Sequence, residues 1–303
     1  MKRILIVLVI LMCFVSLSPE SGFSIFNPSK EAIAGSVDYV FPVYDGSLDS
    51  FTMRQFEDSH INYVSILSRS IDSLLYGNEY NGVSYSNFVK LLVFSFSPAF
   101  THEEAHRSIL TNLKIGSISQ PFFNEQGGAY VKGVRDTELQ NLRNTHLPMF
   151  IRLHTAGIES DYCIAKKEME KMSLQVDSGA NLFFDHYVRI FNVFVYQVSG
   201  IADSYLTPAK KKSSFRDEEE NELERDIVGH DVYGMIRHLF RPDMDYSRYT
   251  VYTDLSSDEQ AFAKRIGWRS FINLIQPYYI MNGNVFQITD KLSLSGSAGY
   301  CIA

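Results

Sequence analysis

The residues of this sequence best suited to chemistry are His102, Glu103 and His106, in the stretch AFTHEEAHRSIL at positions 99–110. In an α-helix, positions four apart lie about 40° apart on one face, one turn up, so the two imidazoles can bind a single metal ion. A catalytic zinc ion takes three protein ligands and leaves a fourth position for water, whose pKa it lowers toward neutrality. Glu103, directly after the first histidine, is placed to accept a proton from that water. The pattern therefore predicts two ligands of a Zn²⁺ site and a general base.

The residues just before this motif are typical of the N-terminus of a helix. Ser97-Pro98 suits the start of a helix, because a serine side chain caps free N–H groups and proline has no N–H to lose. Thr101 and Glu104 also fit a capping box, which would begin the helix four residues later. Either start keeps residues 102–106 helical, and Gly116 is expected to end the helix.

The other elements are read from apolar spacing and turn residues. Helices are expected over 61–75, from residue 88 with its apolar side chains buried, from Thr155, and over 181–201. A hairpin is expected to turn at 125–128, and a second one is expected at VFQITDKLSLSGSAGY near the C-terminus. We expect a mainly helical α+β fold divided into a signal peptide (1–24), a core (25–206), a charged linker or loop (207–225) and a C-terminal helical segment ending in a β-hairpin (226–303).

His102-Glu103-Glu104-Ala105-His106 resembles the active helix of the zincin metallopeptidases, and the resemblance covers about residues 97–165. It implies a zincin-like helical core and peptide-bond hydrolysis. In the gluzincin branch the third ligand is a Glu on a later helix, and Glu159, 53 residues after His106, lies at the right kind of distance. Many gluzincins place Asp four residues after that Glu. Here the position is Cys163, and Asp161 is expected on a different face.

A second, weaker similarity concerns intramembrane site-2-type proteases. HEEAH followed by Gly116, Gly127-Gly128 and Ala156-Gly157 is similar to the order of landmarks in those enzymes. They need several membrane-spanning helices and an Asp ligand, and the sequence shows neither clearly.

Four further polar residues are candidates for the site. His230 is the candidate for stabilising a tetrahedral oxyanion, as a downstream His or Tyr does in zincins. His154 can assist the site or cap a helix, and the pair Asp185-His186 supplies either alternative ligands or satisfied core groups. These alternatives stay open at the level of sequence.

Composition and the N-terminus restrict the functional class. The net charge of −7 argues against a nucleic-acid partner. Lys2 and Arg3 precede a 14-residue apolar run, Ile4–Leu17, which is shorter than the roughly 20 residues that a spanning helix needs. We therefore expect an exported protein, secreted, periplasmic or peripherally associated with the cell envelope, whose signal is cleaved. The pairing of Cys163 and Cys301 stays undecided.

Two functions fit these observations. The first is an exported zinc metallopeptidase acting on a peptide or protein substrate, with His102, His106 and Glu159 as ligands and Glu103 as base. The second is a non-catalytic envelope protein that keeps a zincin-like helix for structure and serves an interaction. A missing third ligand would favour the second.

Overall fold

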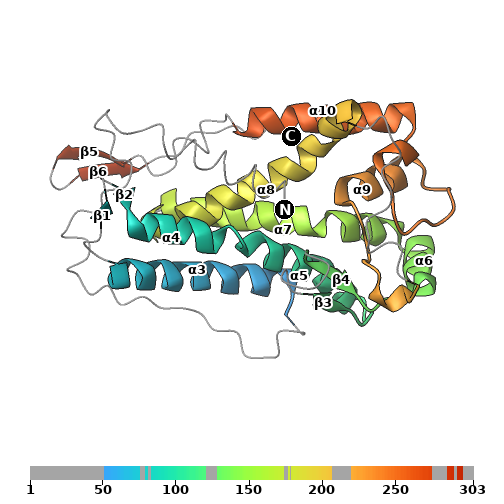
Figure 1. The fold of residues 1–303 in the computed structure, drawn as a ribbon, viewed down its shortest axis with the longest axis horizontal. Helices are drawn as coiled ribbons and strands as arrows, with labels where there is room; N and C mark the ends of the chain where they lie inside the picture. Colours follow the sequence, from blue (N-terminus) through green and yellow to red (C-terminus); the bar gives the residue numbers. More distant parts are fainter. Residues whose placement is uncertain are drawn as a thin grey trace. The chain divides into compact units, whose positions relative to one another are not determined.

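The chain in the computed structural model is mainly helical with short antiparallel hairpins, which confirms the expected class (Figure 1). The structure describes residues 51–75, 79–80, 83–120, 128–173, 177, 179–206, 220–274, 285–289 and 292–295, all within one compact unit, 41–303. The expected signal peptide, most of the charged segment 207–225 and Cys301 lie outside these residues.

Most of the described residues lie in helices. They are α3 (Met53–Leu75), α4 (Tyr85–Phe94), α5 (Ser97–Asn112), α6 (Asp136–Thr145), α7 (Leu147–Ser173), α8 (Gly179–Leu206), α9 (Asp231–Phe240) and α10 (Ser257–Leu274), with the 3₁₀ turns η3 (Glu222–Glu224) and η4 (Tyr252–Asp254).

The strands form three antiparallel pairs. β1 (Glu79–Tyr80) pairs with β2 (Val83–Ser84), β3 (Ile118–Gln120) with β4 (Tyr130–Lys132), and β5 (Val285–Thr289) with β6 (Leu292–Ser295). The β3–β4 hairpin stands where turn residues predict it, and the β5–β6 hairpin stands where partial alternation of apolar residues predicts it. Residues 125–127 of the first expected turn lie outside the described part.

The helix that carries HEEAH begins at the earlier of the two expected starts. Its first residue is Ser97 and Pro98 follows in the first turn. The expected serine cap is wrong, because Phe96 occupies the N-cap position and the Ser97 hydroxyl donates to the Phe94 carbonyl at 2.8 Å. The helix ends at Asn112, before Gly116, because Lys114 takes the left-handed conformation at φ 60° that the sequence assigned to a glycine.

The expected start of the next long helix at Thr155 is wrong. Helix α7 begins at Leu147 with proline in its first turn, directly after the shorter helix α6, which the apolar spacing did not indicate. Glu159 would have fallen in the first turn of a helix that began at Thr155, but it is the thirteenth residue of α7, too far from the N-terminus for the helix dipole to stabilise its carboxylate.

Helix α7 is the element on which the others converge. It contacts α5, α6, α8, α9 and α3 (Figure 1). Leu110, Leu139 and Leu153 are fully buried between α5, α6 and α7, and Ile164 and Leu182 are fully buried in a second cluster with α3 and α8. Burying side chains of this size contributes roughly 1.5–3 kcal/mol each, so this packing fixes α3, α5, α6 and α8 on α7.

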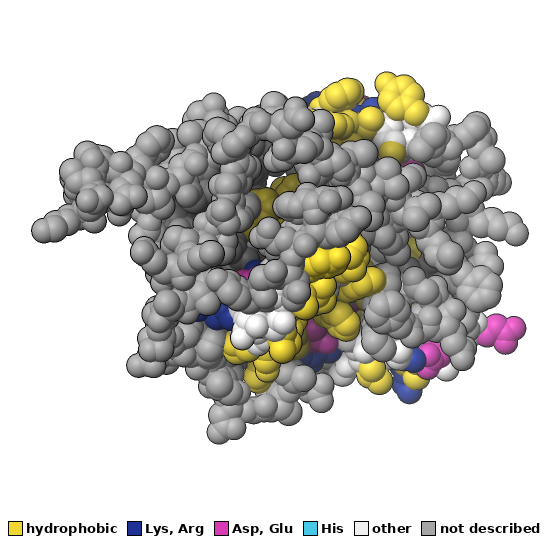
Figure 2. Space-filling model, turned by 60° about the vertical axis from the view of Figure 1, so that its left-hand side comes forward, with side chains coloured by type: hydrophobic (Ala, Val, Ile, Leu, Met, Phe, Trp, Pro, Cys, Tyr) yellow, Lys and Arg dark blue, Asp and Glu magenta, His cyan; other side chains and the backbone are white. Residues whose placement is uncertain are grey.

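Apolar side chains also reach the surface. Along α4 and α5, Leu91 and Phe94 are buried as expected, but Phe88, Leu92 and Phe96 are exposed. Figure 2 shows hydrophobic side chains gathered on one face of the described part. None of the helices in the described ranges combines the length and the apolar character needed to cross a bilayer.

Candidate metal centre

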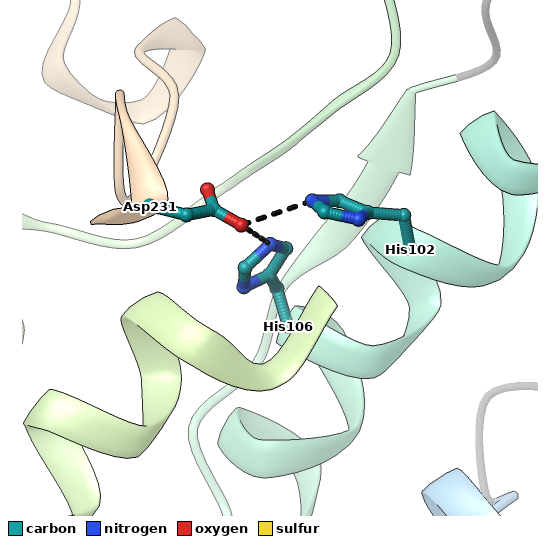
Figure 3. A group of neighbouring side chains, drawn as sticks. All are labelled: His102, His106 and Asp231. Atoms are coloured by element: carbon teal, nitrogen blue, oxygen red, sulfur yellow. Dashed lines mark ion pairs between the residues drawn. The ribbon is translucent and has the colours of Figure 1, made fainter. Parts of the chain in front are cut away.

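Two histidines of α5 and an aspartate of α9 point at one another (Figure 3). The Nε2 atoms of His102 and His106 lie 3.0 and 3.4 Å from Oδ2 of Asp231. All three side chains are buried, with at most 3% of each exposed. Each offers one donor atom within 4.8 Å of the other two, and in the described residues they are the group of three that can hold a metal ion.

The far side of each imidazole is held by the protein. His106 Nδ1 donates to the Leu153 carbonyl at 2.6 Å, and His102 Nδ1 lies 3.0 Å from Oδ2 of Asp161. A carbonyl and a carboxylate accept hydrogen bonds, so both Nδ1 atoms carry a proton, and each Nε2 atom, which faces Asp231, is the nitrogen that can bind a metal once it is deprotonated. Metal-binding histidines are oriented in this way by a carboxylate or carbonyl behind the ring.

Two of the three converging atoms lack hydrogen-bond partners of their own. Across the described residues, neither His102 Nε2 nor Asp231 Oδ2 makes a hydrogen bond of acceptable geometry, although both are buried. Leaving a buried polar atom unsatisfied costs about 1–3 kcal/mol, and native structures rarely keep such atoms without a reason. A cation bound to these atoms would remove that cost, so the donor set fits a metal ion.

Charge in the metal-free cluster is strongly coupled. Burial favours a neutral imidazole, but the carboxylates of Asp231 and Asp161 outweigh it and hold the pKa of His102 well above its usual value. The pKa of His106 is raised by Asp231 in the same way. Burial likewise opposes ionisation of Asp231, yet the two imidazoles hold its pKa well below the usual range. The site thus keeps positive charge beside a carboxylate, where a cation would sit.

Glu103 is the carboxylate beside this cluster. It is half-buried, and burial raises its pKa to about 7 against the opposing effect of His102 and His106. A carboxylate that titrates near neutrality is suited to take up and return a proton at physiological pH.

The backbone of α7 packs closely against the His102 ring at Gly157. A Cβ atom at Gly157 of α7 would lie 2.3 Å from His102 Nε2, so only glycine fits there. On another side the Tyr196 ring of α8 stacks on His102 with centroids 4.7 Å apart. Nothing in the local sequence of α8 distinguishes Tyr196, because it lies in a long apolar helix and its role depends on how α8 packs.

Glu159, expected as the third ligand, lies elsewhere. Its carboxylate makes a bidentate pair with Arg152 at 3.0 and 2.7 Å, at a position with about a third of its side chain exposed. Gly157 faces His102, and a residue two positions later is turned by about 200° around the helix axis. Asp161, four residues after Gly157, shares its face and reaches His102, contrary to the expectation that it points away.

Asp231 is the residue that sequence reasoning passed over. In GHDVYGMIRHLF it stands beside His230, the oxyanion candidate, but it was not assigned as a ligand, because it lies 125 residues after His106 and no spacing rule connects the two. Asp231 lies in the first turn of α9, where an acidic residue is common because it suits the helix dipole, so its position alone did not indicate a metal ligand.

The other candidates occupy the surroundings of the site. His230 precedes α9 and stacks on Tyr233, with ring centroids 3.8 Å apart, while its ring lies 6.2 Å from that of Tyr196. His154 is buried against Gly234 and Phe150, and burial lowers its pKa to about 3. Asp185 and His186 are both buried, but they belong to a network behind the metal centre and do not join the three ligands.

The comparisons with known proteins return nothing for this site. The chain matches no protein-family model, and it has no significant similarity to a curated protein or to a solved structure. The interpretation of the site therefore depends on its own geometry.

Proposed function

We propose that this protein is a metal-dependent hydrolase whose ion is Zn²⁺, bound by His102, His106 and Asp231. The observation that carries the proposal is the convergence of His102 Nε2, His106 Nε2 and Asp231 Oδ2, with both Nδ1 atoms engaged behind the rings. Two imidazoles and one carboxylate make a catalytic zinc shell with room for a fourth ligand. In that position zinc supplies a water of lowered pKa and polarises a carbonyl group.

The chemistry of the chain's own residues follows from their placement. Glu103 accepts the proton of the attacking water and passes it to the leaving group. Tyr196 keeps its phenol protonated, because burial and the nearby carboxylates of Asp231 and Glu103 hold its pKa well above the usual value. Tyr196, which stacks on His102, can therefore donate a hydrogen bond to a developing oxyanion, and His230, whose ring lies 6.2 Å from that of Tyr196, is the second candidate for this role.

A peptide bond is the substrate that the HEEAH motif indicates through its similarity to zincins. The ligand set differs from that of gluzincins, since aspartate replaces glutamate and comes from a much later helix, and for that reason we propose no gluzincin membership. The alternative of a non-catalytic envelope protein was tied to a missing third ligand, and the position of Asp231 supports the catalytic proposal over it. Export remains a proposal from the N-terminal sequence.

The test measures zinc content and affinity of the purified protein, with two matched carboxylate variants. Wild type is expected to bind about one zinc per chain, and a His102→Ala/His106→Ala double variant to bind none at that site. Asp231→Asn should weaken binding by orders of magnitude because a neutral amide is a poor ligand for a divalent cation. Glu159→Gln, which removes only the surface pair with Arg152, should leave affinity unchanged.

The reverse result, weak binding in Glu159→Gln and normal binding in Asp231→Asn, would restore the original ligand assignment. A wild-type protein that binds no zinc would end the hydrolase proposal.

A further inference from the structure

A buried arginine stands behind the metal centre without touching it. Arg189 of α8 is fully buried and is the largest side chain in the described part with less than 2% of its surface exposed. A buried guanidinium is costly unless its donors are satisfied and its charge is paired.

Arg189 meets that requirement through contacts to four helices. Its Nη1 donates to Oδ1 of Asp161 on α7 at 2.7 Å and to Oγ1 of Thr101 on α5 at 2.6 Å. Its Nε donates to Asp185 on its own helix at 2.7 Å. Its Nη2 lies 2.7 Å from His60 Nε2 on α3, a nitrogen that also lies 2.9 Å from Asp185 Oδ2.

The contact with Asp161 leads directly to a metal ligand. Asp161 uses Oδ1 for Arg189, and Oδ2 for His102 Nδ1 at 3.0 Å and for the Asn192 amide at 2.7 Å. The carboxylate can hold the His102 ring only while its own rotation is fixed, and Arg189 fixes the oxygen that His102 does not use. Thr101, the second residue held by Arg189, precedes His102 on α5.

We propose that Arg189 is a positioning residue for the metal centre, acting on His102 through Asp161. The inference rests on the proposed zinc site. Because the planar guanidinium reaches Asp161, Asp185, Thr101 and His60 together, a lysine ammonium at this place can replace only part of the contacts. The orientation of a ligand on α5 therefore depends on how α8 packs against α3 and α7.

The experiment compares zinc affinity and the visible absorption spectrum of the Co²⁺-substituted protein in three variants: R189M, R189K and D161N. R189M should lower zinc affinity about tenfold or more and shift the Co²⁺ bands, and R189K should fall between R189M and wild type. D161N should match or exceed R189M. In the double variant, R189M should add nothing to D161N, because the two act on the same ring.

Two further variants separate positioning from general loss of stability. K90M removes another buried cation, which pairs with Asp72 on α3, and it should lower the melting temperature without changing zinc affinity or the Co²⁺ spectrum. N192A removes the half-buried amide that donates to Asp161 Oδ2, the oxygen that holds His102, and it should lower zinc affinity several-fold. If R189M does not fold, N192A and R189K test the proposal in its place.

Unchanged zinc affinity in R189K and N192A, or additive effects of R189M and D161N, would overturn the assignment and leave the metal site standing. A wild-type protein without zinc affinity overturns both this inference and the proposed function.

Discussion

Replacing Gly157 by alanine should abolish tight metal binding while changing the fold little. The added Cβ would lie 2.3, 2.4 and 2.5 Å from Nε2, Cδ2 and Cε1 of His102, whereas ordinary contacts of a Cβ begin at 3.4 Å. The ring must therefore retreat by about 1 Å, several times the tolerance of about 0.2 Å on a zinc–nitrogen bond. Losing His102 as a ligand should weaken zinc at least about a hundredfold, or about 2.8 kcal/mol.

Helix propensity alone predicts that this substitution stabilises the fold. Alanine in place of glycine inside a helix stabilises by about 1 kcal/mol, and overpacking costs about 1–3 kcal/mol, so the net change in unfolding free energy should be small. Zinc affinity, measured by competition with a chromophoric chelator, should therefore fall sharply. The free energy of unfolding, measured on the protein without metal, should change little.

Two other glycine variants act as controls. Gly200→Ala places a Cβ 2.7 Å from the Ala263 backbone between α8 and α10, and it should destabilise the fold but leave zinc affinity unchanged. Gly116→Ala has open space and should affect neither. Wild-type zinc affinity in Gly157→Ala would show that the added Cβ does not displace the His102 ring, and it would refute the argument from the close approach of Gly157.

Further predictions concern the base, the protons and acid stability. Glu103→Gln should keep zinc and abolish hydrolysis, because an amide cannot accept the proton of water; peptide turnover within a few-fold of wild type would refute this. Zinc binding near pH 7 should release protons, since the raised pKa values of His102 and His106 leave imidazoles protonated in the metal-free protein; calorimetric heats that are independent of the buffer would contradict it. His154, with its pKa lowered to about 3, contributes stability above the unfolded-state pKa of 6.5 that is lost as pH falls toward 3. Its share of the loss between pH 7.5 and pH 5 should be about 2 kcal/mol, and urea titrations of His154→Phe should show a pH dependence that is flatter by that amount.

Local rules in the sequence determined much of what surrounds the site. The position of the HEEAH helix, two alternative starts for it and two hairpins follow from spacing, proline and turn residues, because these effects act within a few residues. The same locality explains the errors. Apolar spacing indicated no helix over α6, which buries only Leu139 and Leu142, and it placed the start of α7 eight residues too late, at Thr155.

The sequence alone determined that His102 and His106 share a face, with Glu103 beside them, because a helical turn brings residues four apart together. It could not identify the third ligand. Glu159 has a suitable distance along the chain, but the face that α7 turns toward α5 is set by Gly157, which permits close approach, and by Asp161, which binds His102. That packing directs Glu159 to the surface and leaves room for Asp231, from a helix 125 residues downstream of His106, to complete the site. Contacts between residues so far apart in sequence are decided by the joint packing of α5, α7, α8 and α9, which no local pattern encodes.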